Sequence, residues 1–162
     1  MGVHAARRLV TFPYLGPHAY SVTCCAFARR PTFLDKDTVA DAATQLLHIS
    51  GEERFAVLAY CFMPDHVHLL VEGASASSDL ARLLARWKQR TGYTHTRVTG
   101  ERLWQGGFYD HVLREGEDRL ALIRYILGNP LRAGLVKSVV EYPFWGSGVW
   151  SRDELIDTLF DG

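Results

Sequence analysis

The sequence predicts an α+β protein with a ferredoxin-like βαββαβ core, in which one antiparallel sheet carries two helices on one face. Two observations indicate this fold: β-branched and aromatic runs alternate with amphipathic stretches, and a tight turn joins two of the runs into a hairpin. The chain has 162 residues, about the length of one domain, and no repeat or linker divides it. We therefore expect a single domain over residues 1–162, with a core at about 19–144 and an acidic tail at 141–162.

Three strands and one helix are predicted in the first half of the chain. Tyr20–Phe27 is rich in β-branched and aromatic residues, and Phe55–Phe62 is apolar throughout, as in a strand buried on both faces. Between them, Asp35–Ile49 carries apolar residues at helical spacing. The turn Met63–Asp65 leads into His66–Glu72, so the last two strands should form an antiparallel hairpin.

The second half adds a helix, a fourth strand and further helices. Ser77 or Ser78 caps the second helix, which fades after Gly92, and Phe108–Leu113 forms the fourth strand. A short helix at Arg152–Phe160 lies in the tail. The apolar stripe of the second helix consists of Leu80, Leu83, Leu84 and Trp87.

A third, additional helix follows the fourth strand and bears a tyrosine. It begins at the acidic segment Glu115–Asp118 and ends at Asn129, because a residue before proline avoids the α region. Its predicted core stripe is Leu120, Ile123 and Leu127. Tyr125 and Asn129 lie one turn apart on the opposite side. On the residues alone, Tyr125 is either a half-exposed ring or a nucleophile, and the Asn129 amide oxygen is a candidate third ligand for a hard divalent ion.

A pair of histidines lies at the start of the third strand. Alternation sends His66 and His68 to one face of the sheet and Val67, Leu69 and Val71 to the other. Two imidazoles side by side can chelate one metal ion. The same pattern also suits two histidines that merely satisfy each other's hydrogen bonds, so the motif by itself leaves both interpretations open.

Charge is distributed unevenly along a chain whose net charge is zero, with 18 basic and 18 acidic side chains. Residues 82–102 hold six basic residues and one acid, whereas residues 141–162 hold five acids and one arginine. Such a basic helix is either a solvated face or a surface for DNA phosphates. The candidate DNA-binding residues are Arg82, Arg86, Lys88, Arg90, Arg97 and Arg102.

Cysteine spacing and hydropathy indicate where the protein resides. The three cysteines have no C-x-x-C spacing, which excludes a zinc knuckle and a disulfide framework. No apolar run approaches the roughly 20 residues of a membrane span. We expect a cytoplasmic protein without a membrane segment.

Four segments occur in a characteristic order. They are YCFMPDHVHLLVE at 60–72, the basic helix, LWQGGFYDHVLR at 103–114 and RYILGNPLRAGLV at 124–136. Together they resemble the single-tyrosine HUH transposases of the smallest insertion sequences, especially the REP-associated tyrosine transposases. The resemblance spans about residues 20–144.

The resemblance implies a mechanism and its residues. His66, His68 and Asn129 would hold Mg²⁺ or Mn²⁺, and Tyr125 would be the nucleophile in cleavage and rejoining of single-stranded DNA near hairpins, through a 5′-phosphotyrosine. The base for Tyr125 is not marked, with His111 and metal-bound water as candidates. The protein would act as a homodimer or as a monomer.

Two other functions stay open on the sequence. One is a non-catalytic relative that only binds hairpin DNA or RNA. The other is an unrelated His-x-His metal hydrolase, in which Tyr125 and Asn129 have no role.

Overall fold

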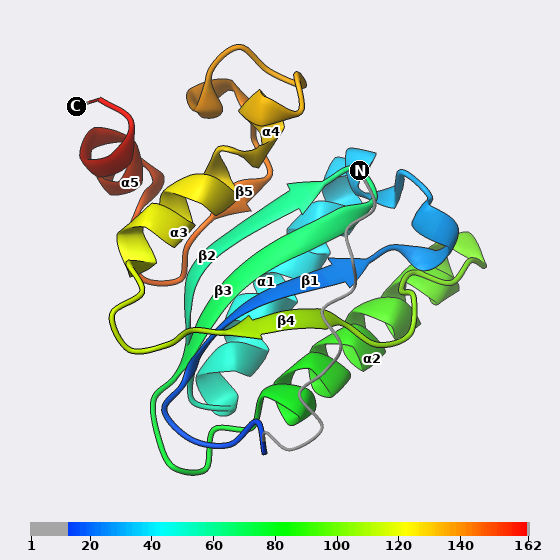
Figure 1. Cartoon of the computed structure of the whole chain (residues 1–162). Helices are drawn as coiled ribbons and strands as arrows, with labels where there is room; N and C mark the ends of the chain where they lie inside the picture. The colour runs from blue at the N-terminus through cyan, green and yellow to red at the C-terminus, as the bar shows by residue number, and fades with distance from the viewer. Residues whose placement is uncertain (1–12, 162) are drawn as a thin grey trace.

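A five-stranded antiparallel sheet, in the order β4-β1-β3-β2-β5, organises the computed structural model of the chain, which describes residues 13–161 (Figure 1). The strands are β1 Ala19–Cys25, β2 Phe55–Met63, β3 His66–Gly73, β4 Tyr109–Val112 and β5 Trp145–Gly146. The first four follow the predicted ferredoxin-like order, so the fold class is confirmed. The single domain over 1–162 stays a prediction, since residues 1–12 and 162 lie outside the described residues.

Helices lie on both sides of this sheet (Figure 1). They are α1 Lys36–Glu52, α2 Leu80–Thr99, α3 Arg119–Leu127, α4 Asn129–Arg132 and α5 Arg152–Leu159, with short 3-10 helices η1 Phe27–Arg29, η2 Thr32–Leu34 and η3 Val139–Glu141. The helices α1 and α2 cover one face, as predicted, and α3 and α5 pack beside β2 on the other. No helix within residues 13–161 is long and apolar enough to cross a membrane.

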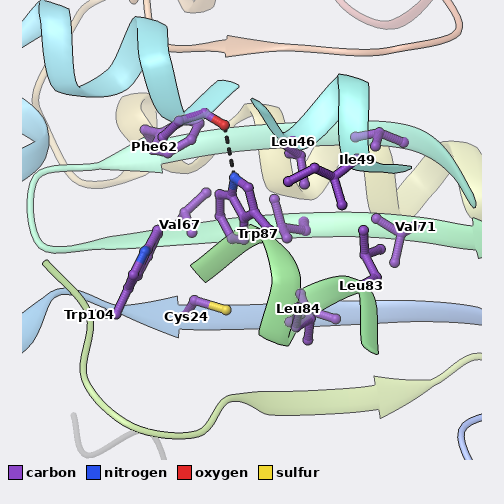
Figure 2. Close-up of a cluster of buried hydrophobic side chains, with 14 of the residues drawn as sticks. Cys24, Leu46, Ile49, Phe62, Val67, Val71, Leu83, Leu84, Trp87 and Trp104 are labelled. Carbon is purple, nitrogen blue, oxygen red and sulfur yellow. Dashed lines mark hydrogen bonds between the residues drawn. The ribbon is translucent and has the colours of Figure 1, made fainter. Parts of the chain in front are cut away.

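Trp87 of α2 is the centre of the core between the sheet and α1 and α2. Its side chain is fully buried, and its indole Nε1 donates a hydrogen bond of 2.9 Å to the carbonyl of Ala42 in α1 (Figure 2). The ring of Trp104 lies 4.8 Å from that of Trp87 and donates to Thr91 Oγ1. Both buried indole N–H groups are therefore satisfied: the first bond joins α2 to α1, and the second joins the segment after α2 to that helix.

A second cluster covers the β2 side of the opposite face. Ile126 and Leu127 of α3 pack there with Trp145 of β5 and Leu155 of α5. The acidic tail is thus partly structural: Arg152 stacks at 3.7 Å on the Trp145 ring and donates to the Trp145 carbonyl. This cluster anchors α3 beside β2 and β3.

Three predicted boundaries were wrong. The second helix is capped by Asp79, whose side chain accepts from the backbone N–H of Arg82, and not by Ser77 or Ser78. The second helix does not fade after Gly92 but continues to Thr99 and ends at Gly100, which has a left-handed φ of 76°. Buried Thr91 and His95 hold this extension against the core. The third helix does not reach Asn129: Asp118 caps it, α3 ends at Leu127, and Asn129 begins α4.

The predicted core stripe of the third helix was wrong at one position. Leu120 is 49% exposed, and the buried positions are Ile123, Ile126 and Leu127. Tyr125 is 59% exposed, which agrees with its predicted place off the apolar face. The two-residue strand β5 was not predicted, because so short a strand has no periodicity to detect.

Two glycines of different surroundings provide a test of the packing. A Cβ at Gly73 would lie 2.3 Å from the backbone oxygen of Gly16, whereas a Cβ at Gly51 in α1 would meet nothing within 4 Å. Gly73→Ala should lower the free energy of unfolding by about 1–3 kcal/mol. Gly51→Ala should raise it by about 0.5–1 kcal/mol. Urea denaturation of both variants measures this, and a neutral Gly73→Ala would contradict the close approach.

Candidate functional site

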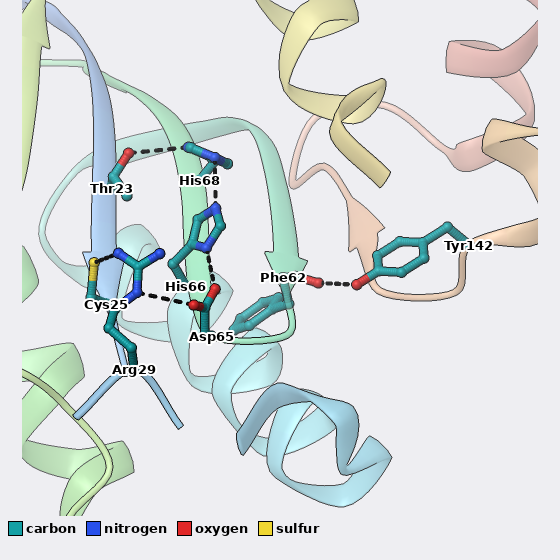
Figure 3. Close-up of polar contacts among 8 residues, drawn as sticks. All are labelled: Thr23, Cys25, Arg29, Phe62, Asp65, His66, His68 and Tyr142. Atoms are coloured by element: carbon teal, nitrogen blue, oxygen red, sulfur yellow. Dashed lines mark hydrogen bonds and ion pairs between the residues drawn. The ribbon is translucent and has the colours of Figure 1, made fainter. Parts of the chain in front are cut away.

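The histidine pair of β3 lies on the sheet face opposite α1 and α2. Val67, between the two histidines, is fully buried in the core with α1 and α2, so strand alternation turns His66 and His68 the other way. Their Nε2 atoms lie 3.1 Å apart, with the rings almost perpendicular at 88° (Figure 3). The predicted shared face of the two imidazoles is observed.

Each imidazole has a partner on its outer nitrogen (Figure 3). Nδ1 of His66 lies 2.6 Å from Asp65 Oδ1, and Nδ1 of His68 lies 3.1 Å from Thr23 Oγ1 on β1. The carboxylate can only accept, so Nδ1 of His66 donates this hydrogen bond, and in the neutral ring Nε2 is the nitrogen that can bind a metal ion. Such outer-nitrogen partners fix ring orientation in metal sites.

Arg29 supports this arrangement from η1. Its Nε donates to Asp65 Oδ2 at 3.0 Å and its Nη1 to Cys25 Sγ at 3.2 Å. The backbone of this turn has positive φ at Ala28 and Arg29, 54° and 53°, a conformation that costs non-glycine residues about 1–3 kcal/mol each. The strained turn aims Arg29 at Asp65.

The charges around the pair shift two pKa values. Partial burial alone would raise the pKa of Asp65, but its hydrogen bonds with His66 and Arg29 outweigh burial and hold the pKa below its ordinary value. Burial, with the nearby charges of His66, Arg132 and Arg29, lowers the pKa of His68 to about 4. His68 is therefore neutral at pH 7, as a metal ligand must be.

The two Nε2 atoms fit a single divalent ion. Nitrogens bound at about 2.0–2.1 Å, with angles between octahedral and tetrahedral, lie roughly 2.8–3.4 Å apart. The observed 3.1 Å falls within that range. Within the described residues, no group of three or more His, Cys, Asp and Glu side chains could hold a metal ion. Among the described residues, a third protein ligand to this pair would be of another type, such as an amide oxygen.

Tyr125 and Asn129 are held together by Arg132, which the sequence did not single out. The guanidinium lies 3.9 Å from the Tyr125 ring centroid and donates to the Tyr125 carbonyl and to Asn129 Oδ1. No hydrogen bond within residues 13–161 joins Tyr125 or Asn129 to His66 or His68. The roles of Tyr125 as nucleophile and of His66, His68 and Asn129 as ligands stay predictions.

Arg132 also places this group relative to the histidines. Its positive charge contributes to the low pKa of His68. Burial raises the pKa of Cys61 to about 12, and the charge of Arg132 acts against this rise. Cys61 on β2 pairs directly with His68 on β3, so both side chains lie on the same sheet face. The guanidinium is therefore within electrostatic reach of the histidine pair.

The predicted DNA-binding residues lie elsewhere, on and after α2, across the sheet from the histidines. Several are engaged within the protein. Arg82 and Arg86 form ion pairs with Glu53, and Arg86 also pairs with Glu52 at the end of α1. Lys88 donates to the carbonyls of Gln105 and Gly107, Arg97 stacks on Tyr93, and Arg102 stacks on Phe27. Arg90 is exposed. Their role in DNA binding stays a prediction.

His111, one candidate base for Tyr125, lies on the edge strand β4. Its Nε2 is 3.0 Å from both carboxylate oxygens of Glu117. In the strand register His111 lies opposite Ser21 of β1, whereas His68 lies opposite Thr23.

The sequence did not identify four residues that support the site: Thr23, Asp65, Arg29 and Arg132. Only Asp65, directly before His66, carried a local signal.

Thr23→Val tests whether the hydrogen bond between Thr23 and Nδ1 of His68 supports metal binding. The Thr23 hydroxyl can both donate and accept, so it can match either tautomer of His68. Thr23→Val keeps the β-branched shape and should weaken Mn²⁺ binding by about 10–100-fold. Isothermal titration calorimetry measures this, with Ser21→Ala, on the same strand and face, as the control. Wild-type affinity in Thr23→Val would show that this hydrogen bond does not tune the site.

The low pKa of His68 predicts a pH dependence of stability. The unfolded chain binds a proton to this histidine near pH 6.5, but the folded chain does so only near pH 4. Unfolding then takes up a proton, so the free energy of unfolding of the metal-free protein should fall as pH decreases from about 6.5 to 4. Denaturation in EDTA should show a shallower decline for His68→Gln. Equal slopes would contradict the shift.

Comparisons with known proteins find relatives that are named tyrosine transposases. The chain is 26% identical over 100 residues to the REP-associated tyrosine transposase of Escherichia coli K12, covering 61% of this chain and 58% of the relative. It is 26% identical over 101 residues to a putative REP-associated tyrosine transposase of Haemophilus influenzae Rd, covering 56% and 57%. The chain thus matches less than two thirds of the length of either relative.

Two solved structures share the fold. A REP-associated tyrosine transposase bound to a REP hairpin superposes with a TM-score of 0.69 at 22% identity, covering 86% of this chain and 82% of the other. A putative transposase from Deinococcus radiodurans R1 gives a TM-score of 0.52 at 18% identity, covering 73% and 94%. The family model described as "Transposase IS200 like" matches residues 17–128, a span that includes both histidines and Tyr125. Because this match covers well over half of the chain, the protein belongs to the IS200-like transposase family.

Proposed function

We propose that the protein is a metal-dependent single-tyrosine transposase that cleaves and rejoins single-stranded DNA near a hairpin. The observation that carries the proposal is the pair of Nε2 atoms 3.1 Å apart, each ring fixed by a partner on its outer nitrogen. Family membership and relatives named tyrosine transposases support it. The solved relative bound to a REP hairpin suggests the kind of DNA.

The metal would be held by His66, His68 and the Asn129 amide oxygen. Mg²⁺ or Mn²⁺ bound there would neutralise charge on the scissile phosphate and stabilise the leaving 3′ oxygen. Asp65 and Thr23 keep the two rings in position while DNA enters. Both ions suit a site that mixes neutral imidazoles with an oxygen ligand and leaves positions for phosphate.

Tyr125 would attack the phosphorus in line, with its proton passing to a base. The P–O bond to the 3′ oxygen breaks, which leaves a 5′-phosphotyrosine and a free 3′ hydroxyl. A 3′ hydroxyl from another strand then attacks the phosphotyrosine and releases Tyr125. One phosphodiester is exchanged for another, so no nucleotide cofactor is required. The exposure of Tyr125, 59%, leaves its ring accessible to DNA.

A second function is favoured by a separate observation. Arg90 and Arg97 of α2 are exposed and form no ion pair with a carboxylate in the described part of the chain, and they lie across the sheet from the histidines, where DNA phosphates would be bound without chemistry. This is the function expected of a non-catalytic hairpin-binding relative. Family membership removes the reason for an unrelated His-x-His hydrolase. The active unit would be a homodimer or a monomer.

Tyr125→Phe tests the proposal. A labelled single-stranded hairpin incubated with Mn²⁺ should give an adduct with the wild-type protein that survives SDS, and Tyr125→Phe should abolish it, because no phenolic oxygen remains. Hairpin affinity should change less than about threefold, since a lone hydroxyl at an exposed position contributes little to binding. Mg²⁺ should also support the adduct.

Tyr93→Phe is the matched control, since Tyr93 is 64% exposed but lies on α2. It should form the adduct at the wild-type rate. An adduct that persists in Tyr125→Phe would reject Tyr125 as the nucleophile. If the wild-type protein binds the hairpin but forms no adduct with either Mn²⁺ or Mg²⁺, the transposase proposal is rejected and the non-catalytic hairpin-binding function is supported.

A further inference from the structure

We propose that Arg132 is a catalytic residue with two partners: it holds Asn129 while the site is free of DNA, and it moves to a non-bridging oxygen of the scissile phosphate when metal and DNA bind. This inference rests on the proposed function and assigns a phosphate-binding group to that site. Four observations support it, namely its contacts, the competition they create, the space at Gly128 and the unpaired charge of the guanidinium.

The contacts of Arg132 bridge the break between α3 and α4. Its Nη2 donates to the Tyr125 carbonyl in the last turn of α3 and to the Asn129 side chain at the first residue of α4. The guanidinium lies over the Tyr125 ring, 3.9 Å from its centroid. One side chain therefore contacts both the proposed nucleophile and the proposed third metal ligand.

These contacts compete with metal binding. Oδ1 of Asn129 already accepts from the guanidinium, and a divalent cation bound to the same oxygen would lie close to the positive charge of Arg132. Nδ2 of the same amide is buried and has no hydrogen-bond partner among the described residues. Asn129 is thus held in this orientation at the cost of an unsatisfied donor, and loss of the Arg132 contact would let it turn.

Gly128 supplies the space for this arrangement. A Cβ there would lie 2.8 Å from Nη1 of Arg132 and 3.0 Å from the carbonyl oxygen of Arg124. Its φ of −81° suits any residue, so glycine is required here for room and not for backbone conformation. The folded-back position of Arg132 therefore depends on this glycine.

The charge of Arg132 points to the second partner. Both of its hydrogen-bond acceptors are neutral oxygens, and no carboxylate forms an ion pair with it in the described part of the chain. Arg29, the other arginine near the pair, already binds Asp65. Arg132 lies within electrostatic reach of His68. A guanidinium that is exposed, has no carboxylate partner and contacts both the proposed nucleophile and the proposed third ligand suits a phosphodiester, which it can bind with two parallel N–H groups.

The test measures two quantities that a purely structural role would move together. In Arg132→Gln, the Mn²⁺ affinity without DNA, measured by calorimetry, should rise several-fold because Asn129 is released. The single-turnover rate of adduct formation with saturating hairpin and Mn²⁺ should fall about 10²-fold, because a charged donor to the phosphate is lost. Arg124→Ala, an exposed arginine next to Tyr125, is the control and should change neither quantity.

Gly128→Ala tests the contact of Arg132 with Asn129 separately from its proposed contact with phosphate. It displaces the guanidinium from Asn129 but keeps it in the protein, so Mn²⁺ affinity should rise while the adduct rate falls less than in Arg132→Gln. Thermal melting confirms that each variant is folded. Lower Mn²⁺ affinity together with a lower rate in Arg132→Gln would overturn the inference, as would an unchanged rate.

The outcomes also distinguish this inference from the proposed function. If the wild-type protein forms no adduct, the transposase proposal fails, and Arg132 is judged on Mn²⁺ affinity and on Mn²⁺-dependent hairpin affinity. Arg132→Gln should then raise the first and lower the second. A change of either quantity in the other direction, or no change, would overturn the two-partner role.

Discussion

The pairing of β3 with β1 and β2 is the constraint on which the candidate site depends. It places Thr23 and Cys61 opposite His68 on either side, and it buries Val67 on the far face. A shift of one residue in this register would turn both histidines into the apolar core and bring valines to the face that now carries the histidines. The dense packing of Trp87 between α1, α2 and the sheet excludes that shift, because Val67, Leu69 and Val71 fill that face. The core thus fixes the geometry of the two imidazoles.

The arginines on the two sides of the sheet differ in how far nearby carboxylates neutralise them. On the α1 and α2 side, the arginines at the start of α2 are largely balanced by Glu52 and Glu53, so the basic stretch of the sequence is less positive in the fold than along the chain. On the other side, Arg29 is balanced by Asp65, but Arg132 is bound only to neutral oxygens. The zero net charge of the chain therefore conceals an uncompensated cation close to the histidines. A site that receives phosphate benefits from such a charge, because its attraction is strongest where water is partly excluded.

The helices on the histidine face differ in how firmly they are held. Ile126, Leu127 and the tail residues Trp145 and Leu155 secure α3 against β2, while Tyr125 itself remains exposed. Beyond Gly128 the chain starts a separate short helix, α4, and the side chain of Arg132 bridges the break. An anchored helix that ends in a junction of this kind can hold Tyr125, the proposed nucleophile, in a fixed place while Asn129, the proposed ligand, adjusts its position. That division suits chemistry in which metal and DNA must both enter the site.

The sequence by itself determined the order of the first four strands and the two helices between them, the shared face of His66 and His68, and the exposure of Tyr125, because these depend on local periodicity and on alternation along a strand. Local signals misplaced the end of the second helix and the burial of Leu120, where packing against the sheet decides the outcome. Only the tertiary structure decided that Thr23 supports His68, that Glu53 pairs with Arg82, and that Arg132 folds back onto Asn129. The first two contacts join residues 45 and 29 positions apart in the chain, and the third requires the space at Gly128, so no local pattern specifies them.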